Sequence, residues 1–243
     1  MMQLLLCSSS GYQQSSYLSH TRPYLEQFLA AQDRPVTRAL FIPYAGVTKS
    51  DDQYLAQVQP HFHAVGIELT GLHQVSDAAQ AIAKAQMIIV GGGNTFVLLK
   101  RLQQQQLLVP IQNRIRAGIP YMGWSAGSNL AGLSIATTND MPIVEPENFT
   151  ALTLIPFLIN PHFISGQIPG HHGESREQRL AEYMVMNPEQ TVIALPEGTA
   201  LWQQGNSLSL LGSVPALRFK AGSQQSIALG DCSFLLGDQD DYR

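Results

Sequence analysis

Short, unbroken apolar runs alternate with amphipathic stretches along the first three-quarters of the chain, and this alternation is the strongest constraint on the fold. The apolar runs, which predict strands, are residues 3–7, 39–44, 66–69, 87–93, 119–124 and 191–196. The amphipathic stretches predict helices over 23–32, 51–59, 77–85, 95–118 (with a break at Pro110) and 175–187. Apolar strands that alternate with helices predict a parallel sheet with helices on both faces.

The last part of the chain, residues 198–230, has a different pattern. Short strand-like runs are separated there by Gly-Asn, Gly-Ser and Ala-Gly turns, which predict antiparallel hairpins that extend the sheet. With 243 residues, of which 44% are hydrophobic, the chain is long enough for one well-buried core. We therefore expect residues 1–243 to form a single α/β domain with a doubly wound, mostly parallel sheet and C-terminal antiparallel hairpins.

Composition excludes several classes of partner. A formal net charge of −4 gives no electrostatic reason to expect nucleic acid or an anionic membrane. The apolar run at the N-terminus is too short to span a membrane and lacks a basic flank, so it predicts a first strand in a soluble, cytoplasmic protein. Cys7 and Cys232 lie far apart in the sequence, which predicts two buried thiols in a reducing compartment.

Neither a metal nor a cofactor is expected. His61 and His63 lie close together after Pro60, but no carboxylate cluster is nearby to complete the three or four ligands of a zinc site. The glycine-rich stretch "VGGGNTF" at 90–96 has neither the dinucleotide-binding nor the P-loop spacing of glycines.

Ser125 lies in the sequence "GWSAGS" (123–128), between a predicted strand and a run of small residues. The spacing Gly123-x-Ser125-x-Gly127 matches the nucleophile elbow, whose small residues allow a tight strand-to-helix turn that exposes the serine. Such a turn would lie at the carboxyl end of a strand, where doubly wound folds bind ligands. The alternative is that Ser125 or Ser128 caps an ordinary helix.

A nucleophilic serine needs a base and a group that orients the base. His162, in "LINPHFISG", follows an apolar run at a predicted strand end, which we expect at the same sheet edge as Ser125. Glu197 follows the apolar run 191–196, where packing does not explain a carboxylate, and Asp140 in "TTNDMPI" is the competing carboxylate. A serine, a histidine and a carboxylate at strand ends predict acyl-transfer chemistry.

Acyl transfer also needs backbone donors for the oxyanion. The three glycines of "VGGGNTF" follow a predicted strand and precede a helix, where exposed N–H groups can approach a ligand closely. We expect the N–H of Gly92 or Gly93, together with that of Ala126, to form the oxyanion hole.

Five motifs, "GGGNTFVLL", "GWSAGSNLA", "TTNDMPIV", "NPHF" and "ALPEG", resemble in order and separation those of the peptidase E family of aspartyl dipeptidases. The similarity covers nearly the whole chain. It implies a cytoplasmic serine peptidase that cleaves dipeptides with an N-terminal aspartate, on a flavodoxin-like fold akin to class I glutamine amidotransferases. The resemblance implies Ser125 as nucleophile, His162 as base and Glu197 as the third member. Asp140 either replaces Glu197 in orienting His162 or holds the substrate amine.

A preference for aspartate requires a cation in the substrate pocket, and Arg176 is the candidate. The sequence "SREQ" (175–178) is a capping box that begins a helix, so Arg176 lies in the first helical turn. A cation there opposes the helix dipole unless it binds an anion. The alternative is a solvated surface arginine.

Two other functions fit the same motifs. One is a cyanophycinase-like hydrolase of β-aspartyl peptides, and the other is a catalytically inactive, amidotransferase-like binding domain. We expect a small peptide as the partner of the site and either a monomer or a homodimer.

Overall fold

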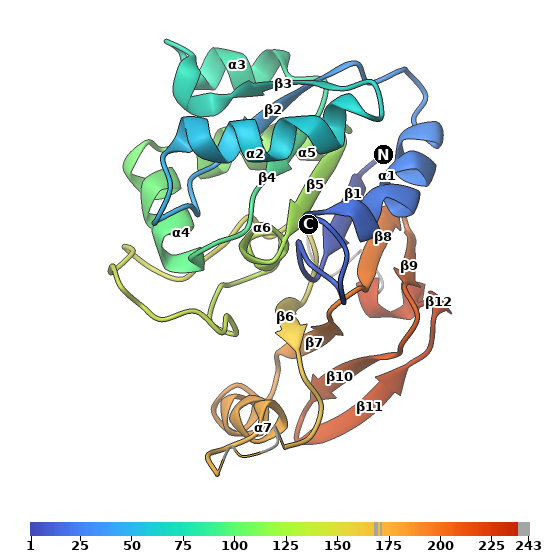
Figure 1. Ribbon diagram of the computed structural model, residues 1–243. Helices are drawn as coiled ribbons and strands as arrows, with labels where there is room; N and C mark the ends of the chain where they lie inside the picture. The colour runs from blue at the N-terminus through green and yellow to red at the C-terminus, as the bar shows by residue number, and fades with distance from the viewer. Residues whose placement is uncertain (168–169, 171, 238–243) are drawn as a thin grey trace.

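The computed structural model describes residues 1–167, 170 and 172–237. In these residues the larger sheet has the strand order β12-β9-β8-β1-β5-β4-β2-β3 (Figure 1). Its strands are β1 (Gln3–Cys7), β2 (Arg38–Ile42), β3 (Glu68–Gly71), β4 (Ile88–Val90), β5 (Tyr121–Trp124), β8 (Ala200–Gln204), β9 (Ser207–Leu211) and β12 (Gly230–Asp231). The five strands from β1 to β3 in this order are parallel, and β8, β9 and β12 add to the β1 edge in antiparallel pairing.

Helices cover both faces of this sheet, as the alternation predicts. They are α1 (Arg22–Ala30) and α2 (Asp51–His63) on one face, and α3 (Ala78–Lys84), α4 (Thr95–Gln104) and α5 (Leu108–Arg116) on the other. Phe62 of α2 is fully buried against Trp124 at the end of β5, and Ile115 of α5 is fully buried on the opposite face. Burial of one such side chain stabilises the fold by about 1.5–3 kcal/mol. The predicted α/β class is confirmed.

A second, smaller sheet differs from the expectation of one continuous sheet. Its order is β11-β10-β7-β6, with strands β6 (Leu158–Phe163), β7 (Thr191–Pro196), β10 (Ala216–Lys220) and β11 (Ser223–Ile227). It lies with α7 (Arg176–Met186) at the lower end of the view in Figure 1. The chain turns sharply between β7 and β8 at Gly198, whose φ is 80°, so these two strands enter different sheets. The β8–β9 hairpin and β12 extend the larger sheet, whereas the β10–β11 hairpin pairs with β7.

Two predicted helix boundaries are wrong. The stretch 95–118 breaks at residues 105–107, where Gln106 has a φ of 55°, and not at Pro110. Pro110 lies in the first turn of α5, where its missing N–H has no helical acceptor to lose. α2 continues past residue 59 to His63, with Pro60 inside its last turn.

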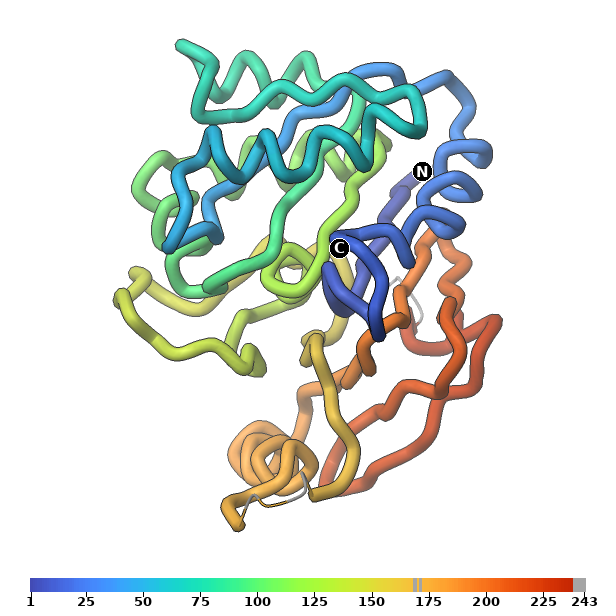
Figure 2. The backbone as a smooth tube through the Cα atoms, viewed as in Figure 1, coloured from blue at the N-terminus to red at the C-terminus, as the bar shows by residue number. Residues whose placement is uncertain are grey.

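The loop after β1 brings the N-terminal part of the chain to the turn that follows β5. Figure 2 shows this blue loop beside the turn between β5 and α6 (Ala126–Asn129). Two hydrogen bonds fix the contact: the backbone N–H of Ser125 donates to the Cys7 carbonyl (3.1 Å), and Ser128 Oγ donates to the same oxygen (2.7 Å). The ends of β1, β4 and β5 therefore converge around Ser125.

Cys7 and Cys232 are both buried and unpaired, as predicted. None of the helices in the described part of the chain is long and apolar enough to cross a membrane. Among the described residues, no group of three or more histidine, cysteine or acidic side chains is arranged to hold a metal ion.

His61 makes the stability of the fold depend on pH. Its partial burial, with the charges of Arg22 and His20, lowers its pKa from 6.5 to about 4. The unfolded chain therefore binds a proton in this range that the folded chain does not bind, so the contribution of His61 to stability falls as the pH falls from about 6.5 to about 4. We expect the Tm of the His61→Gln protein to fall less over this pH interval than the Tm of the wild type.

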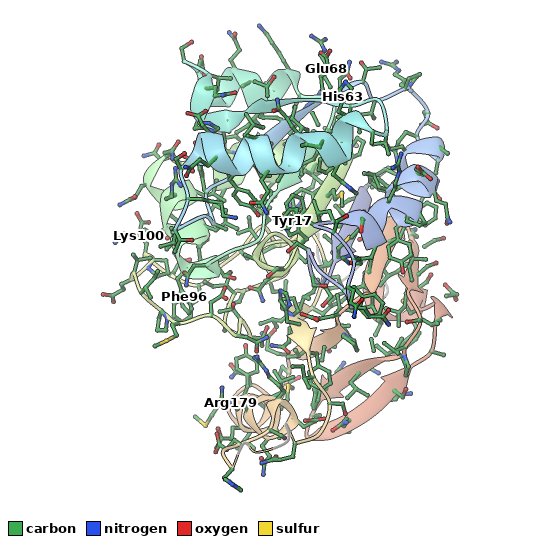
Figure 3. All side chains as sticks on the ribbon, viewed as in Figure 1. Tyr17, His63, Glu68, Phe96, Lys100 and Arg179 are labelled. Atoms are coloured by element: carbon green, nitrogen blue, oxygen red, sulfur yellow. The ribbon has the colours of Figure 1, made fainter. Side chains whose placement is uncertain are left out.

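The measurement is a series of thermal unfolding curves between pH 7 and pH 4, with His63→Gln as the matched control. His63 lies at the same helix end but is exposed at the surface (Figure 3). Parallel Tm profiles for the wild type and His61→Gln would show that this ring does not contribute to the acid sensitivity.

Candidate active site

Ser125 lies on a strained turn between β5 and α6. Its φ of 52° and ψ of −115° place a non-glycine residue in a sparsely populated region, at a cost of about 1–3 kcal/mol. A Cβ on Gly123 would lie 2.5 Å from the carbonyl carbon of Gly127, and a Cβ on Gly127 would lie 2.2 Å from the Val90 oxygen. The two glycines thus allow β5, α6 and β4 to approach closely. Ser125 makes no side-chain capping hydrogen bond, so its hydroxyl is available to another partner.

That partner is His162. Its Nε2 lies 2.8 Å from Ser125 Oγ, and its Nδ1 lies 2.7 Å from Glu197 Oε1. His162 also has a positive φ, 53°, at a register shift between β6 and β7. The structure therefore brings together the predicted serine, histidine and glutamate in one hydrogen-bonded series.

The expectation that His162 and Ser125 share a sheet edge is wrong. Ser125 follows β5 of the larger sheet, whereas His162 lies in β6 and Glu197 follows β7 of the smaller sheet. Ser8, directly after β1, connects the two sheets: its Oγ accepts the backbone N–H of His162 (3.0 Å) and donates to the Leu195 carbonyl (2.8 Å). Ser8 is fully buried, so this bridge is shielded from water.

Asp140 has a different environment from Glu197. Its Oδ2 accepts the backbone N–H of Thr95 (2.7 Å) and the hydroxyls of Thr95 (2.6 Å) and Thr138 (3.1 Å). These bonds hold the carboxylate at the N-terminus of α4, where the helix dipole favours a negative charge. Asp140 nevertheless lines the same cavity of about 580 Å³ as Ser125 and His162. It is therefore placed to face a ligand, while Glu197 contacts the imidazole.

The glycines after β4 lie against the serine. A Cβ on Gly92 would be 3.0 Å from Ser125 Cβ, and both Gly92 and Gly93 line the cavity. The carbonyl of Gly92 accepts the Tyr54 hydroxyl (2.8 Å). The backbone N–H groups of Gly92, Gly93 and Ala126 donate to no acceptor among the described residues. All three predicted oxyanion donors are thus unused, and either glycine can act together with Ala126.

Arg176 is the first residue of α7, which begins with the predicted capping box of Ser175 and Gln178. Arg176 and Asp140 line an adjacent cavity of about 200 Å³. Burial lowers the pKa of Arg176, and the charge of Arg179 lowers it further, while Asp140 opposes both effects. No carboxylate in the described part of the chain forms an ion pair with Arg176. Its guanidinium is thus half-buried without a partner anion, unlike a solvated surface arginine.

Sequence reasoning missed Ser8, Tyr54 and Thr95, which support the site through hydrogen bonds. Ser8 carried a signal, since it directly follows a strand whose carboxyl end faces the site. Tyr54 carried none, because it occupies an apolar position of an amphipathic helix and its acceptor lies 38 residues away.

Comparison with known proteins places this site in a family. The family model described as peptidase family S51 matches residues 4–211. Peptidase E of Shewanella denitrificans is 50% identical over 225 residues, which are 93% of this chain and 94% of that protein. Peptidase E of Pasteurella multocida is 48% identical over 224 residues, covering 92% and 95% of the two chains.

A crystal structure of a peptidase from an acI-B1 actinobacterium superposes with a TM-score of 0.67 over 94% of this chain and 95% of its own, at 17% identity. At this identity the likeness extends to the fold alone. The fold and the sequence relatives together define a hydrolase of the peptidase class. The chain belongs to peptidase family S51.

Proposed function

We propose that this chain is a serine dipeptidase that hydrolyses dipeptides with an N-terminal aspartate through an acyl-enzyme on Ser125. The observation that carries the proposal is the series Ser125 Oγ, His162 Nε2, His162 Nδ1 and Glu197 Oε1, with separations of 2.8 and 2.7 Å at its two hydrogen bonds. This is the arrangement of nucleophile, base and orienting carboxylate that acyl transfer requires. It also argues against an inactive binding domain.

In the proposed reaction, His162 Nε2 takes the proton of Ser125 Oγ as this oxygen attacks the scissile carbonyl. We assign the N–H groups of Gly93, one of the two candidate glycines, and Ala126 as donors to the resulting oxyanion. Collapse of the tetrahedral intermediate breaks the C–N bond, and His162 gives its proton to the leaving amine. A water molecule, deprotonated by His162, then attacks the acyl ester and releases the N-terminal residue. Glu197 holds the imidazole and stabilises its charged form.

Recognition of aspartate rests on the adjacency of the two cavities. Both are lined by Asp140, and we place the N-terminal side of a substrate whose carbonyl lies at Ser125 next to Asp140 and Arg176. The guanidinium of Arg176, which forms no ion pair with a carboxylate of the described residues, offers two N–H groups to the side-chain carboxylate. Within the described residues, the hydrogen bonds of the Asp140 carboxylate all go to Oδ2, and in the proposal its other oxygen accepts the substrate ammonium. The peptidase E names of the relatives support peptide hydrolysis as the activity.

The first prediction concerns the nucleophile. Ser125→Ala should lower kcat on Asp-X dipeptides by about three or more orders of magnitude, because it removes the attacking atom. The measurement is steady-state hydrolysis of a panel of Asp-X, Glu-X, Asn-X and β-aspartyl dipeptides, with the Tm as a control for folding. If a folded Ser125→Ala protein retained most of the activity, the serine mechanism would be refuted. Preferential cleavage of β-aspartyl-arginine by the wild type would favour the cyanophycinase-like alternative.

The second prediction separates the two carboxylates. Glu197→Gln should reduce kcat more than Asp140→Asn does, because Glu197 contacts the base directly. Asp140→Asn should mainly raise KM if this side chain holds the substrate amine. Both effects are read from kcat and KM on one Asp-X substrate, and the reverse pattern would exchange the two assigned roles.

The third prediction concerns specificity. Arg176→Met should lose about 2–5 kcal/mol of kcat/KM on Asp-X, because it leaves the substrate carboxylate buried without its cation. The loss on Asn-X should be far smaller. Arg179→Met is the matched control: Arg179 lines the same cavity from α7 (Figure 3) but has Glu174 at 3.9 Å. Equal losses on Asp-X and Asn-X would mean that Arg176 supports the local structure and does not bind the substrate carboxylate.

A further inference from the structure

Three aromatic side chains form a continuous series of hydrogen bonds beneath the candidate active site. Trp124 Nε1 donates to the Tyr17 hydroxyl (3.2 Å), the hydroxyls of Tyr17 and Tyr54 lie 3.1 Å apart, and the Tyr54 hydroxyl donates to the Gly92 carbonyl (2.8 Å). The three residues come from β5, from the loop after β1 and from α2. The proposed chemistry uses none of their polar groups.

The direction of every bond in this series follows from the chemistry of its ends. The indole N–H of Trp124 can only donate, and the Gly92 carbonyl can only accept. The single proton of Tyr54 goes to Gly92, so Tyr54 must accept from Tyr17. Tyr17 in turn accepts from Trp124. The protons therefore all point from Trp124 toward Gly92, and such aligned bonds strengthen one another.

The series connects the two halves of the proposed oxyanion hole. Trp124 lies two residues before Ala126, the donor that follows the nucleophile. Gly92 shares a peptide plane with Gly93, the donor on the glycine turn after β4. A peptide bond is planar and trans, so a hydrogen bond that fixes the Gly92 carbonyl also fixes where the Gly93 N–H points.

The two donor turns are otherwise held by separate contacts: the Asn94 N–H donates to the Ala45 carbonyl (2.8 Å), and the Ser125 N–H donates to the Cys7 carbonyl (3.1 Å). The φ of Gly93 is 133°, a conformation that glycine alone adopts freely, so its own backbone supplies little rigidity. The anchor at the other end is rigid: Trp124 is fully buried and stacked on Phe41, with ring centroids 6.0 Å apart.

We propose that Tyr54, with Tyr17, is a positioning residue that fixes the Gly93 N–H relative to the Ala126 N–H and so sets the geometry of the oxyanion hole. This role rests on the proposed serine mechanism. Withdrawal of electron density from the Gly92 carbonyl by the Tyr54 hydroxyl also makes the Gly93 N–H of the same peptide a stronger donor.

Both tyrosines keep their protons near neutral pH. Burial raises the pKa of Tyr17 above its usual value and raises that of Tyr54 well above it. Tyr54 is almost completely buried and Tyr17 is partly exposed, and both line the cavity that contains Ser125. Figure 3 shows Tyr17 close to the carboxyl end of β5, next to α6. Tyr17 thereby links the position of the loop after β1 to the oxyanion donors.

The test removes single hydroxyls. Tyr54→Phe should lower kcat on Asp-X about ten- to hundredfold with KM within about twofold, because an oxyanion donor acts mainly on the transition state. Tyr17→Phe should have the same signature with a smaller loss, since it leaves the Tyr54–Gly92 bond in place. Tyr44→Phe is the matched control: Tyr44 is also buried, but its hydroxyl donates to Gln105 Oε1 (3.2 Å), away from the cavity. It should leave kcat unchanged.

A second readout does not depend on aspartate recognition. A small fluorophosphonate labels Ser125 through a transition state whose phosphoryl oxygen occupies the oxyanion hole, and intact-protein mass spectrometry gives the rate. Tyr54→Phe should slow labelling in parallel with kcat. Unchanged kcat and labelling in a folded Tyr54→Phe protein, or a rise in KM alone, would overturn the positioning role.

The two proposals fail in distinguishable ways. A wild-type protein that is labelled at Ser125 but does not cleave Asp-X would refute the proposed substrate, and the labelling rates of the tyrosine variants would still decide the positioning role. A wild-type protein that neither cleaves nor becomes labelled would refute the serine mechanism and the role of Tyr54 with it. If Tyr54→Phe does not fold, Tyr17→Phe decides the question by the same two measurements.

Discussion

The hydrogen bond between Ser125 and His162 joins side chains from two different sheets, and the organisation of the whole site depends on holding those sheets in register. Ser8, which follows β1 of the larger sheet, connects them. Its buried hydroxyl accepts the backbone N–H of His162 and donates to the carbonyl of Leu195, and both partners lie in strands of the smaller sheet. Asn129 adds a second bridge from α6, donating to the carbonyl of Ile159 in β6. The strained backbone at Ser125 and at His162 is tolerated because these neighbours leave each residue little freedom to relax.

Much of the fold was predictable because local pattern determines it. The strands 3–7 and 191–196 were predicted to the residue, since each is a mainly apolar run with a serine or glycine shortly after its carboxyl end. The division into two sheets was not predictable, because an apolar strand pairs equally well with either sheet and the choice depends on the turn at Gly198. The helix break at Gln106 was missed for a related reason: no glycine or proline marks its left-handed backbone.

The candidate site likewise contains residues that the sequence predicts and residues that it does not. Ser125, His162 and Glu197 were predictable because each follows or ends a strand, and polar groups at strand ends have few structural explanations. Tyr54 and Tyr17 were not, since a tyrosine in an amphipathic stretch packs as an apolar residue and its hydroxyl contributes no periodic signal. The separate environments of Asp140 and Glu197 likewise arise from contacts between distant segments, which motifs do not encode.

The smaller sheet and its helix carry His162, Glu197 and Arg176, while the larger sheet carries Ser125 and the proposed oxyanion donors. In the proposed mechanism, the base and the specificity cation therefore belong to one structural unit. Substitutions that reshape this unit to accept another N-terminal residue also shift the imidazole relative to Ser125. Selection on such a chain cannot tune substrate preference and catalytic alignment independently, so new specificities arise most readily by changes confined to the α7 surface, with the β6–β7 pairing left intact.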